Sequence, residues 1–275
     1  MTTVVITGAA GFVGRHLAAY LTETGVEVLP LSRQVVAGMV RVDDYRNSPA
    51  GDAVVHLAEP DRANASRDGD AVIRNSAEVA SELARRFKGR VVYASSTHVY
   101  GDDHSFPCRV DTPVLGTDVY STYKLLNEQI ILDAGGAVAR ISNLVGPGMA
   151  ANMVVSDILS QVPGSGPVRV RDGAPICDFL PVEDAAAALG LMALSAVSGI
   201  VNVGSGVGTS VNGLARLLLA IALEEHRVVV ATNPSSRQSV NVLDISETTR
   251  ILGWSPVTTL EKELTRLIRD KSRTS

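Results

Sequence analysis

The sequence has little cysteine, little aromatic content and no excess of basic charge, and these shortages exclude several classes of protein. Only Cys108 and Cys177 are present in the 275 residues, far apart and in no metal-like spacing. We therefore expect neither a disulfide framework nor a metal site. The net charge of −4 argues against nucleic acid as a partner, because such binding usually requires a surplus of basic residues. Together these features predict a cytoplasmic protein.

Long hydrophobic runs are also missing. The two most apolar segments, 185–197 and 214–223, are too short to cross a bilayer, and acidic pairs at 183–184 and 224–225 flank them. We expect both to be buried helices and expect no membrane partner. The residues at 1–6 have neither a basic region nor a small-residue cleavage site, so we expect no signal peptide.

What is present is an alternation of short β-branched runs with longer helical patterns. With 45% hydrophobic residues the chain can bury a sizeable core. The pattern predicts an α/β fold, a doubly wound parallel sheet of the Rossmann type. The expected strands are 3–7, 26–31, 53–57, 90–94 and 136–141, and the expected helices are 12–24, 70–87 and 118–133.

After about residue 145 the pattern becomes irregular, with a helix near 152–162 and a short strand Val-Arg-Val. Such sequence after a regular half usually builds the cover over a substrate. We predict a dinucleotide-binding domain at 1–145 and a smaller, mainly substrate-binding α/β region at 146–275. Segments near 177–203 could pack back on the first domain.

The strongest motif is TGAAGFVG, which follows the first expected strand. Its glycines, Gly8, Gly11 and Gly14, would let the chain turn tightly, let the backbone approach a pyrophosphate, and let the next helix pack closely. Phe12 and Val13 open that helix. We predict that these five residues bind a dinucleotide.

The second expected strand indicates which dinucleotide. An acidic residue at its end would accept hydrogen bonds from the ribose hydroxyls of NAD, but here the strand ends in Ser32 and Arg33. A serine and an arginine can instead bind a 2′-phosphate. NADP(H) is therefore favoured, and NAD(H) stays possible; a solvated loop arginine is the alternative for Arg33.

Three motifs in order give the chain a family resemblance: TGAAGFVG, ASSTHVYG at 94–101 and YSTYK at 120–124. With them the sequence resembles the extended short-chain dehydrogenase/reductase family, and within it the nucleotide-sugar epimerases, dehydratases and 4-ketoreductases. Further similar pieces run from DAVVHLAEP at 52–60 to LDISETTRILGWSP at 243–256. The resemblance covers nearly the whole chain.

The resemblance implies catalytic roles for Ser96, Tyr120 and Lys124. In the family's reaction a hydride moves between a sugar carbon and the nicotinamide, while a proton moves between the attached oxygen and the tyrosine. A free phenol ionises near pH 10, so nearby positive charge must stabilise the phenolate. Lys124 would supply that charge and would also hydrogen-bond the cofactor's ribose. Ser96 would hydrogen-bond the substrate oxygen, with Ser95 and Thr97 as neighbouring alternatives.

Other positions are also implied by the resemblance. For the cofactor, besides Tyr120 and Lys124, they are Asp43 or Asp44 at the adenine, Leu57 and Ala58 along the cofactor, and Asn75 near the active site. For the substrate they are Thr97, His98, Asn143, Asn152 and Arg237.

Two departures from the family's pattern narrow the chemistry. The family's 4,6-dehydratases carry an Asp-Glu pair after the catalytic hydroxyl, but this chain has Thr97 and His98, so the usual dehydratase is disfavoured. Cys177 replaces an arginine that commonly binds the diphosphate. Arg237 matches the other usual diphosphate arginine, and Arg169 and Arg171 could compensate.

The implied function is an NAD(P)-dependent enzyme that acts on a nucleotide-linked sugar. Reduction of a 4-keto sugar is slightly favoured, and a 4-epimerase with tightly held NAD is nearly equal to it. A reductase of a non-nucleotide carbonyl compound and an inactive cofactor-sensing regulator are weaker alternatives. The resemblance also implies a homodimer through a four-helix bundle made by the helices at 70–87 and 118–133.

Overall fold

The chain alternates strands and helices through its first half and becomes less regular afterwards. The computed structural model describes residues 2–60, 69–101, 104–235 and 239–274. The first half contains β1 (Thr3–Thr7), α1 (Phe12–Glu23), β2 (Glu27–Ser32), β3 (Val40–Arg41), η1 (Tyr45–Asn47), β4 (Ala53–His56), α3 (Gly69–Phe87), β5 (Val91–Ser96), η2 (Thr97–Tyr100), α4 (Val119–Asp133) and β6 (Ala137–Ile141). The second half contains β7 (Asn143–Val145), α5 (Val154–Ser160), β8 (Val168–Val170), β9 (Ile176–Pro181), α6 (Val182–Leu194), β10 (Gly199–Val203), β11 (Gly208–Ser210), α7 (Val211–Ile221), β12 (Val229–Ala231), β13 (Val240–Asn241), α8 (Ser246–Leu252) and α9 (Leu260–Thr274).

A parallel sheet forms the centre of the molecule. Within the described residues it has seven strands in the order β10-β6-β5-β4-β1-β2-β3, and each neighbouring pair is parallel. Both faces are covered, so the strands read as nearly continuous apolar runs rather than alternating ones. In β1, Val4 and Ile6 belong to the core on one face and Val5 to the core on the other. The doubly wound α/β prediction is therefore confirmed.

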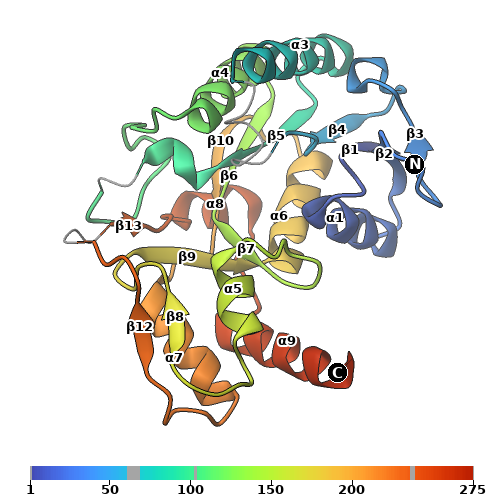
Figure 1. The fold of residues 1–275 in the computed structure, drawn as a ribbon. Helices are drawn as coiled ribbons and strands as arrows, with labels where there is room; N and C mark the ends of the chain where they lie inside the picture. The colour runs from blue at the N-terminus through green and yellow to red at the C-terminus, as the bar shows by residue number, and fades with distance from the viewer. Residues whose placement is uncertain (1, 61–68, 102–103, 236–238, 275) are drawn as a thin grey trace.

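Helices form one layer on each side of the sheet (Figure 1). α1 and α6 pack together over one face, where Leu17, Leu21 and Leu189 are fully buried. α3 and α4 pack together over the other face, where Leu83 and Ile131 are fully buried. The layers position the amino ends of α1 and α4 at the same edge of the sheet as the carboxyl ends of its strands.

The expected strands and helices of the first half are present, with ends within a few residues of those predicted. The helix expected near 152–162 is shorter at both ends, since α5 spans Val154–Ser160. Pro163 disfavours helical geometry at Val162 and so limits the carboxyl end. β10 was not among the expected strands; it pairs with β6 and closes the edge of the sheet.

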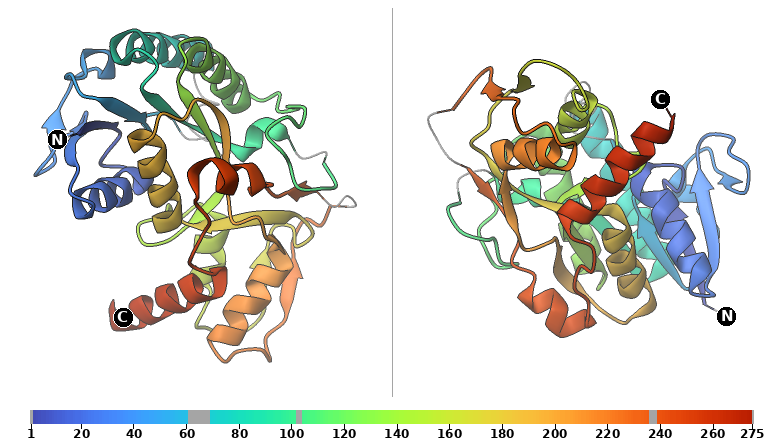
Figure 2. Two further views of the ribbon diagram at one scale, coloured as in Figure 1. Left: turned by 180° about the vertical axis from the view of Figure 1, so that it is seen from behind. Right: turned by 90° about the horizontal axis from the view of Figure 1, so that it is seen from below.

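The second region lies below the carboxyl edge of the sheet (Figures 1 and 2). Its strand β9 pairs with β7, β11 and β13, and an apolar cluster that includes residues of α5, α7 and α9 supports it. Asp178 of β9 is buried and accepts hydrogen bonds from the amides of Ser205, Gly206 and Leu243. Burial raises the pKa of Asp178, although these donors oppose the rise. The division at 145/146 stays a prediction.

The two most apolar sequence segments form most of α6 and α7. Ala185, Ala188 and Leu189 of α6 are fully buried against the sheet, and Leu214 and Leu218 of α7 are fully buried in the second region. Among the helices of the described ranges, none is long and apolar enough to cross a membrane.

Candidate active site

The carboxyl edge of the central sheet contains a cavity of about 820 Å³. It lies at the point where the strand order reverses. From β1 the chain proceeds to β2 and β3 on one side of β1, and then returns to β4, β5 and β6 on its other side. In open α/β sheets such a reversal leaves a crevice in which ligands bind. The volume is within the range of small-molecule and cofactor sites. We call this cavity the main cavity; a neighbouring space of about 270 Å³ is the side cavity.

Most of the residues predicted from the sequence line one of these two cavities. Those lining the main cavity are Gly8, Gly11, Phe12, Val13, Gly14, Arg33, Leu57, Ser96, His98, Tyr120, Lys124 and Asn143. Those lining the side cavity are Arg33, Asp43, Asp44, Ala58 and Asn75. Ser32, Thr97 and Asn152 line neither cavity, and Arg237 lies outside the described residues.

The glycine loop after β1 is closely packed and depends on the absence of side chains. Gly8 has φ +69°, and a Cβ there would lie 3.0 Å from backbone atoms of Ala58. A Cβ on Gly14 would lie 2.4 Å from the carbonyl oxygen of Gly8, so the helix can approach the loop only without one. Among the described residues, no side chain caps the amino end of α1. Its amides are therefore open to an anion in the main cavity.

Arg33 lies at the end of β2 and lines both cavities. Its guanidinium carbon lies 5.8 Å from the ring centroid of Tyr45, a distance typical of a cation–π contact. Ser32 is buried, and its hydroxyl accepts a hydrogen bond from the amide of Gln34. Arg33 is thus the side chain of this pair that reaches the cavities, while Ser32 stabilises the turn.

Asp43 and Asp44 differ in their surroundings although both line the side cavity. Asp43 has a side chain that is 88% exposed and pairs with Arg41. Asp44 caps η1 through the amide of Arg46 and contacts its guanidinium at 2.5 Å. The Arg46 hydrogen bonds hold the pKa of Asp44 below its usual value. Asn75, on α3, lies across the same cavity.

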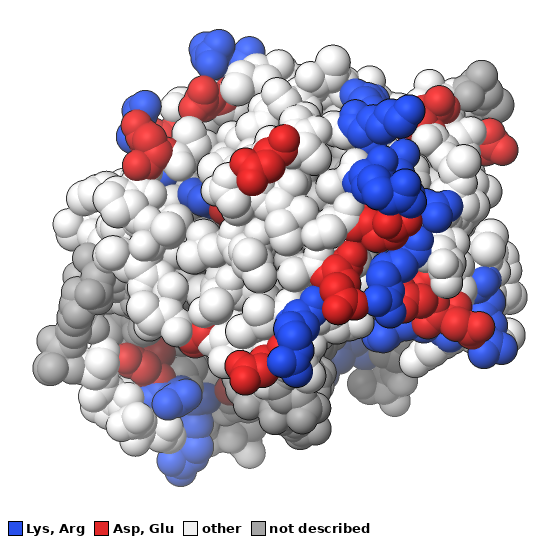
Figure 3. Space-filling view, turned by 90° about the horizontal axis from the view of Figure 1, so that it is seen from above, with Lys and Arg blue, Asp and Glu red and all other residues white. Residues whose placement is uncertain are grey.

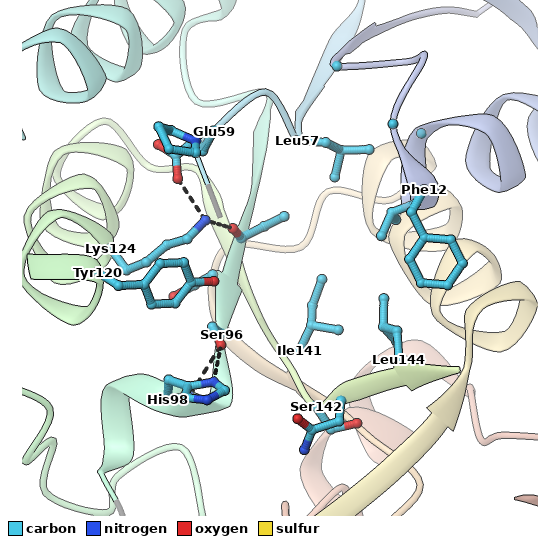
Figure 4. Close-up of a pocket in the computed structure, with 18 of the residues that line it drawn as sticks. Phe12, Leu57, Glu59, Ser96, His98, Tyr120, Lys124, Ile141, Ser142 and Leu144 are labelled. Atoms are coloured by element: carbon cyan, nitrogen blue, oxygen red, sulfur yellow. Dashed lines mark hydrogen bonds and ion pairs between the residues drawn. The ribbon is translucent and has the colours of Figure 1, made fainter. Parts of the chain in front are cut away.

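α4 brings Tyr120 and Lys124 to the main cavity. Asp118 caps the helix by accepting a hydrogen bond from the amide of Ser121 at 2.8 Å. Tyr120 and Lys124 are four residues apart and therefore share one helix face. The ammonium nitrogen of Lys124 lies 5.7 Å from the ring centroid of Tyr120. Figure 4 shows the Tyr120 ring between Lys124 and Ser96.

Ser96 ends β5 and faces this tyrosine (Figure 4). Its oxygen accepts the backbone amide of His98 at 3.2 Å, and it lies 3.1 Å from Nδ1 of the His98 ring. The His98 ring meets the ring of Tyr120 edge-on, with centroids 6.0 Å apart. One hydroxyl, one imidazole and one phenol thus converge at one side of the main cavity.

The two hydroxyls beside Ser96 have partners elsewhere in the protein. Ser95 donates to the buried carboxylate of Glu128. Thr97 is almost fully buried and donates to Oδ1 of Asn241 at 2.5 Å. Of the three neighbouring hydroxyls, the one of Ser96 is therefore directed toward Tyr120.

The sequence reasoning missed Glu59, the carboxylate at the centre of the site. It follows β4 by three residues, and its side chain is 4% exposed. Its Oε2 accepts hydrogen bonds from Lys124 and Tyr93, both at 2.6 Å. Its Oε1 accepts from Ser76 at 2.5 Å and from Asn127 at 2.6 Å. A lone glutamate before a proline gives no sequence signal for such a position, because the partners come from three other elements.

His56 lies behind Glu59 and is neutral. The Thr7 hydroxyl oxygen accepts from the amides of Leu57 and Ala58, so it donates its proton to Nδ1 of His56 at 2.7 Å. Nε2 therefore carries the ring proton and lies 3.8 Å from Oε1 of Glu59. Burial lowers the pKa of His56 to about 4, although the Glu59 charge opposes this shift.

The predicted diphosphate contacts are dispersed. Asn143 lines the main cavity, whereas Asn152 and Arg171 line a separate cavity of about 460 Å³ next to β8. Cys177 is half-buried in β9 and contributes to the apolar cluster of the second region.

The chain is similar in sequence to known proteins over most of its length. A family model described as the NAD dependent epimerase/dehydratase family matches residues 4–204. The chain is 28% identical to a GDP-6-deoxy-D-mannose reductase of Pseudomonas aeruginosa, with 96% of this chain and 95% of that protein covered. It is 25% identical to a putative UDP-glucose 4-epimerase of Methanocaldococcus jannaschii, with 96% and 97% covered.

Solved structures share the fold across the whole chain. A UDP-glucose 4-epimerase from Thermotoga maritima with UDP-glucose superposes with a TM-score of 0.86 at 21% identity, over 99% of both chains. RMD from Pseudomonas aeruginosa, complexed with NADPH, superposes with a TM-score of 0.86 at 24% identity, over 100% of both chains. At these identities the likeness shows a common fold, in which one relative binds a nucleotide sugar and another binds NADPH.

Proposed function

The chain belongs to the NAD-dependent epimerase/dehydratase family, and from that premise we propose that it reduces a 4-keto nucleotide sugar with NADPH. One observation carries the choice of reaction and cofactor. β2 ends at Ser32 and Arg33 follows it, without an acidic side chain at either position, and Arg33 lines both cavities beside Tyr45. An arginine there suits a 2′-phosphate. A reductase that uses NADPH once per turnover fits this binding preference.

In the proposed reaction Tyr120 acts as the proton donor. NADPH, when bound, supplies the hydride that adds to the carbonyl carbon. The carbonyl oxygen takes the phenolic proton of Tyr120 and becomes a hydroxyl, and solvent later returns a proton to the phenolate. Lys124 stabilises the phenolate by its charge, and Ser96 donates a hydrogen bond to the same substrate oxygen. The glycine loop and the amino end of α1 would hold the pyrophosphate of the cofactor.

A second candidate is a nucleotide-sugar 4-epimerase that retains NAD through turnover. The relative from Methanocaldococcus jannaschii favours it, as does the sequence ASSTHVYG at the end of β5. An epimerase would use Tyr120 as the base and then as the acid at the same sugar oxygen. The same residues therefore serve both reactions, and the cofactor that the protein retains distinguishes them.

The first experiment identifies that cofactor. The purified protein is denatured, and any released nucleotide is identified by mass spectrometry and absorbance. We expect little bound nucleotide, tighter binding of NADPH than of NADH, and turnover with members of a panel of 4-keto nucleotide sugars that Tyr120→Phe abolishes. Stoichiometric NAD or NADH would contradict the proposal and favour the epimerase.

Arg33→Ala tests the assignment of the cofactor contact. Loss of a charge-assisted contact costs about 1.5–3 kcal/mol, so NADPH binding should weaken by about 10- to 100-fold while NADH binding changes little. Arg85→Ala is the matched control, because Arg85 is a largely exposed arginine that pairs with Glu82 on α3. Equal weakening of NADPH and NADH by Arg33→Ala would contradict the role of this side chain.

A further inference from the structure

Glu59 is a charged group in a place where an isolated charge is costly. Its side chain is 4% exposed and forms part of the wall between the main and side cavities. A buried carboxylate is tolerated when it is paired and its oxygens are hydrogen-bonded. Glu59 is paired with Lys124, and both of its oxygens accept hydrogen bonds. The surrounding structure therefore stabilises the Glu59 carboxylate in this position.

We propose that Glu59 is a positioning residue that holds Lys124 in its charged form, and in one place, beside Tyr120. The significance for turnover rests on the proposed function, since it assumes that Lys124 assists Tyr120. The effect on the charge of Lys124 does not depend on which reaction the enzyme catalyses.

The geometry fixes both partners. The ammonium nitrogen of Lys124 donates to Oε2 of Glu59 at 2.6 Å and to the carbonyl oxygen of Ala94 at 2.7 Å (Figure 4). Within the described residues these contacts use two of its three donors, and Lys124 also lines the main cavity, where a ligand could accept from the third. Glu59 cannot swing away easily, because Ser76 and Asn127 hold its other oxygen.

Glu59 is the negative group in direct contact with the Lys124 ammonium. His56 behind it is neutral, as its hydrogen bonds with Thr7 require. Burial alone would lower the pKa of Lys124, but the charge of Glu59 reverses this and the pKa is raised. The charged or titratable groups that face the pair, or line the same cavity, are His56 from β4, Tyr93 from β5, Tyr120, Tyr123 and Glu128 from α4, His98 from η2 and Arg33 after β2.

Nuclear magnetic resonance can follow this charge directly, because the sequence contains only four lysines: Lys88, Lys124, Lys262 and Lys271. Protein labelled with carbon-13 at the lysine ε-carbon gives one titrating signal for each, and Lys124→Met identifies the signal of Lys124. In the unsubstituted protein we expect the pKa of Lys124 to lie above the ordinary pKa of a lysine side chain, about 10.4. If Lys124 loses its proton at that pH or below it, the proposal is overturned without any further variant.

Glu59→Gln keeps the shape of the side chain and removes its charge. We expect the Lys124 signal to titrate at lower pH than in the unsubstituted protein. Turnover should fall by about 10- to 100-fold with a smaller effect on substrate KM, and the alkaline limb of its pH profile should move to lower pH. Glu263→Gln is the control, because Glu263 is also buried and paired, with Arg266 at 2.7 Å, but lines neither cavity.

The outcomes separate this inference from the proposed function. If no 4-keto nucleotide sugar reacts, the proposed function is wrong. The titration of Lys124 can still be measured in that case, so the role of Glu59 is tested independently. An unshifted Lys124 signal in Glu59→Gln, or a shift no larger than in Glu263→Gln, overturns the role assigned to Glu59.

Discussion

His56 illustrates how a single buried residue ties stability to pH. It lies at the carboxyl end of β4, 1% exposed, and its ring is neutral in the folded protein. Burial lowers its pKa to about 4, whereas a histidine in the unfolded chain has a pKa near 6.5. Below pH 6.5 the unfolded chain therefore binds a proton that the folded chain does not, and stability decreases as pH falls.

We predict that the free energy of unfolding decreases by roughly 3 kcal/mol between about pH 6.5 and 4 because of His56. Denaturant unfolding at pH 7, 6 and 5 measures this, and in His56→Gln the dependence over that interval should be much weaker. His226→Gln makes the same substitution at an exposed histidine and is the control for the exchange itself. An equally steep dependence in His56→Gln would contradict the assignment.

At the scale of an element, the β1–α1 loop depends on the absence of a side chain at Gly14. The helix packs so closely on the loop that a Cβ at this position would lie 2.7 Å from the Cα of Ala9 as well as 2.4 Å from the oxygen of Gly8. Both contacts are to backbone atoms, which cannot rotate away. The helix would have to move outward, and the amides that we propose to hold the pyrophosphate would move with it.

Gly14→Ala should therefore destabilise the fold by about 1–3 kcal/mol and should weaken NADPH binding. Thermal unfolding and a fluorescence titration with NADPH measure the two effects. Gly69→Ala is the control, because a Cβ there makes only ordinary contacts, at 3.4 Å and 3.6 Å, with Val119. Unaltered binding in a folded Gly14→Ala protein would show that the loop does not approach the cofactor closely.

At the scale of the whole molecule, the outer face of α3 and α4 is the surface we propose for a homodimer. Figure 3 shows this face, with a band of basic and acidic side chains beside a broad area that carries little charge. On α4, Asn127 and Glu128 are buried on the side that faces the protein. Leu126 points in another direction from the same helix and is 41% exposed. Two such pairs of helices could pack as a four-helix bundle around a two-fold axis.

We predict that the protein is a dimer in light scattering at micromolar concentration and that Leu126→Glu makes it monomeric. A charge introduced on each side of a two-fold interface is desolvated and faces its own copy, so the effect is doubled. Val257→Glu changes an aliphatic side chain that is 82% exposed and should leave the dimer intact. A monomer in the unsubstituted protein would refute the proposed bundle.

Much of the fold and part of the site follow from local patterns in the sequence. Strand and helix periods are local, so β1, α1, α3 and α4 could be predicted within a few residues of their observed ends. The carboxyl ends of parallel strands meet at one edge, so the glycine loop, Ser96 and Asn143 could be expected near one another. The four-residue spacing of Tyr120 and Lys124 is enough to place both on one helix face.

Tertiary structure alone decided which residues pair with Glu59 and which hydroxyl faces Tyr120, because both depend on contacts between distant segments. Nothing near Glu59 in sequence indicates that Tyr93 and Lys124 complete its hydrogen bonds, since they come from β5 and α4. The sequence ASSTHVYG offers three adjacent hydroxyls that cannot be told apart by pattern. In the folded chain Ser95 donates to Glu128 and Thr97 donates to Asn241, so these two hydroxyls are directed away from Tyr120. The sequence by itself determined that the glycine loop and Tyr120 lie at one edge of the sheet. The folded chain decided which carboxylate pairs with Lys124, because buried charges acquire their partners only when the core forms.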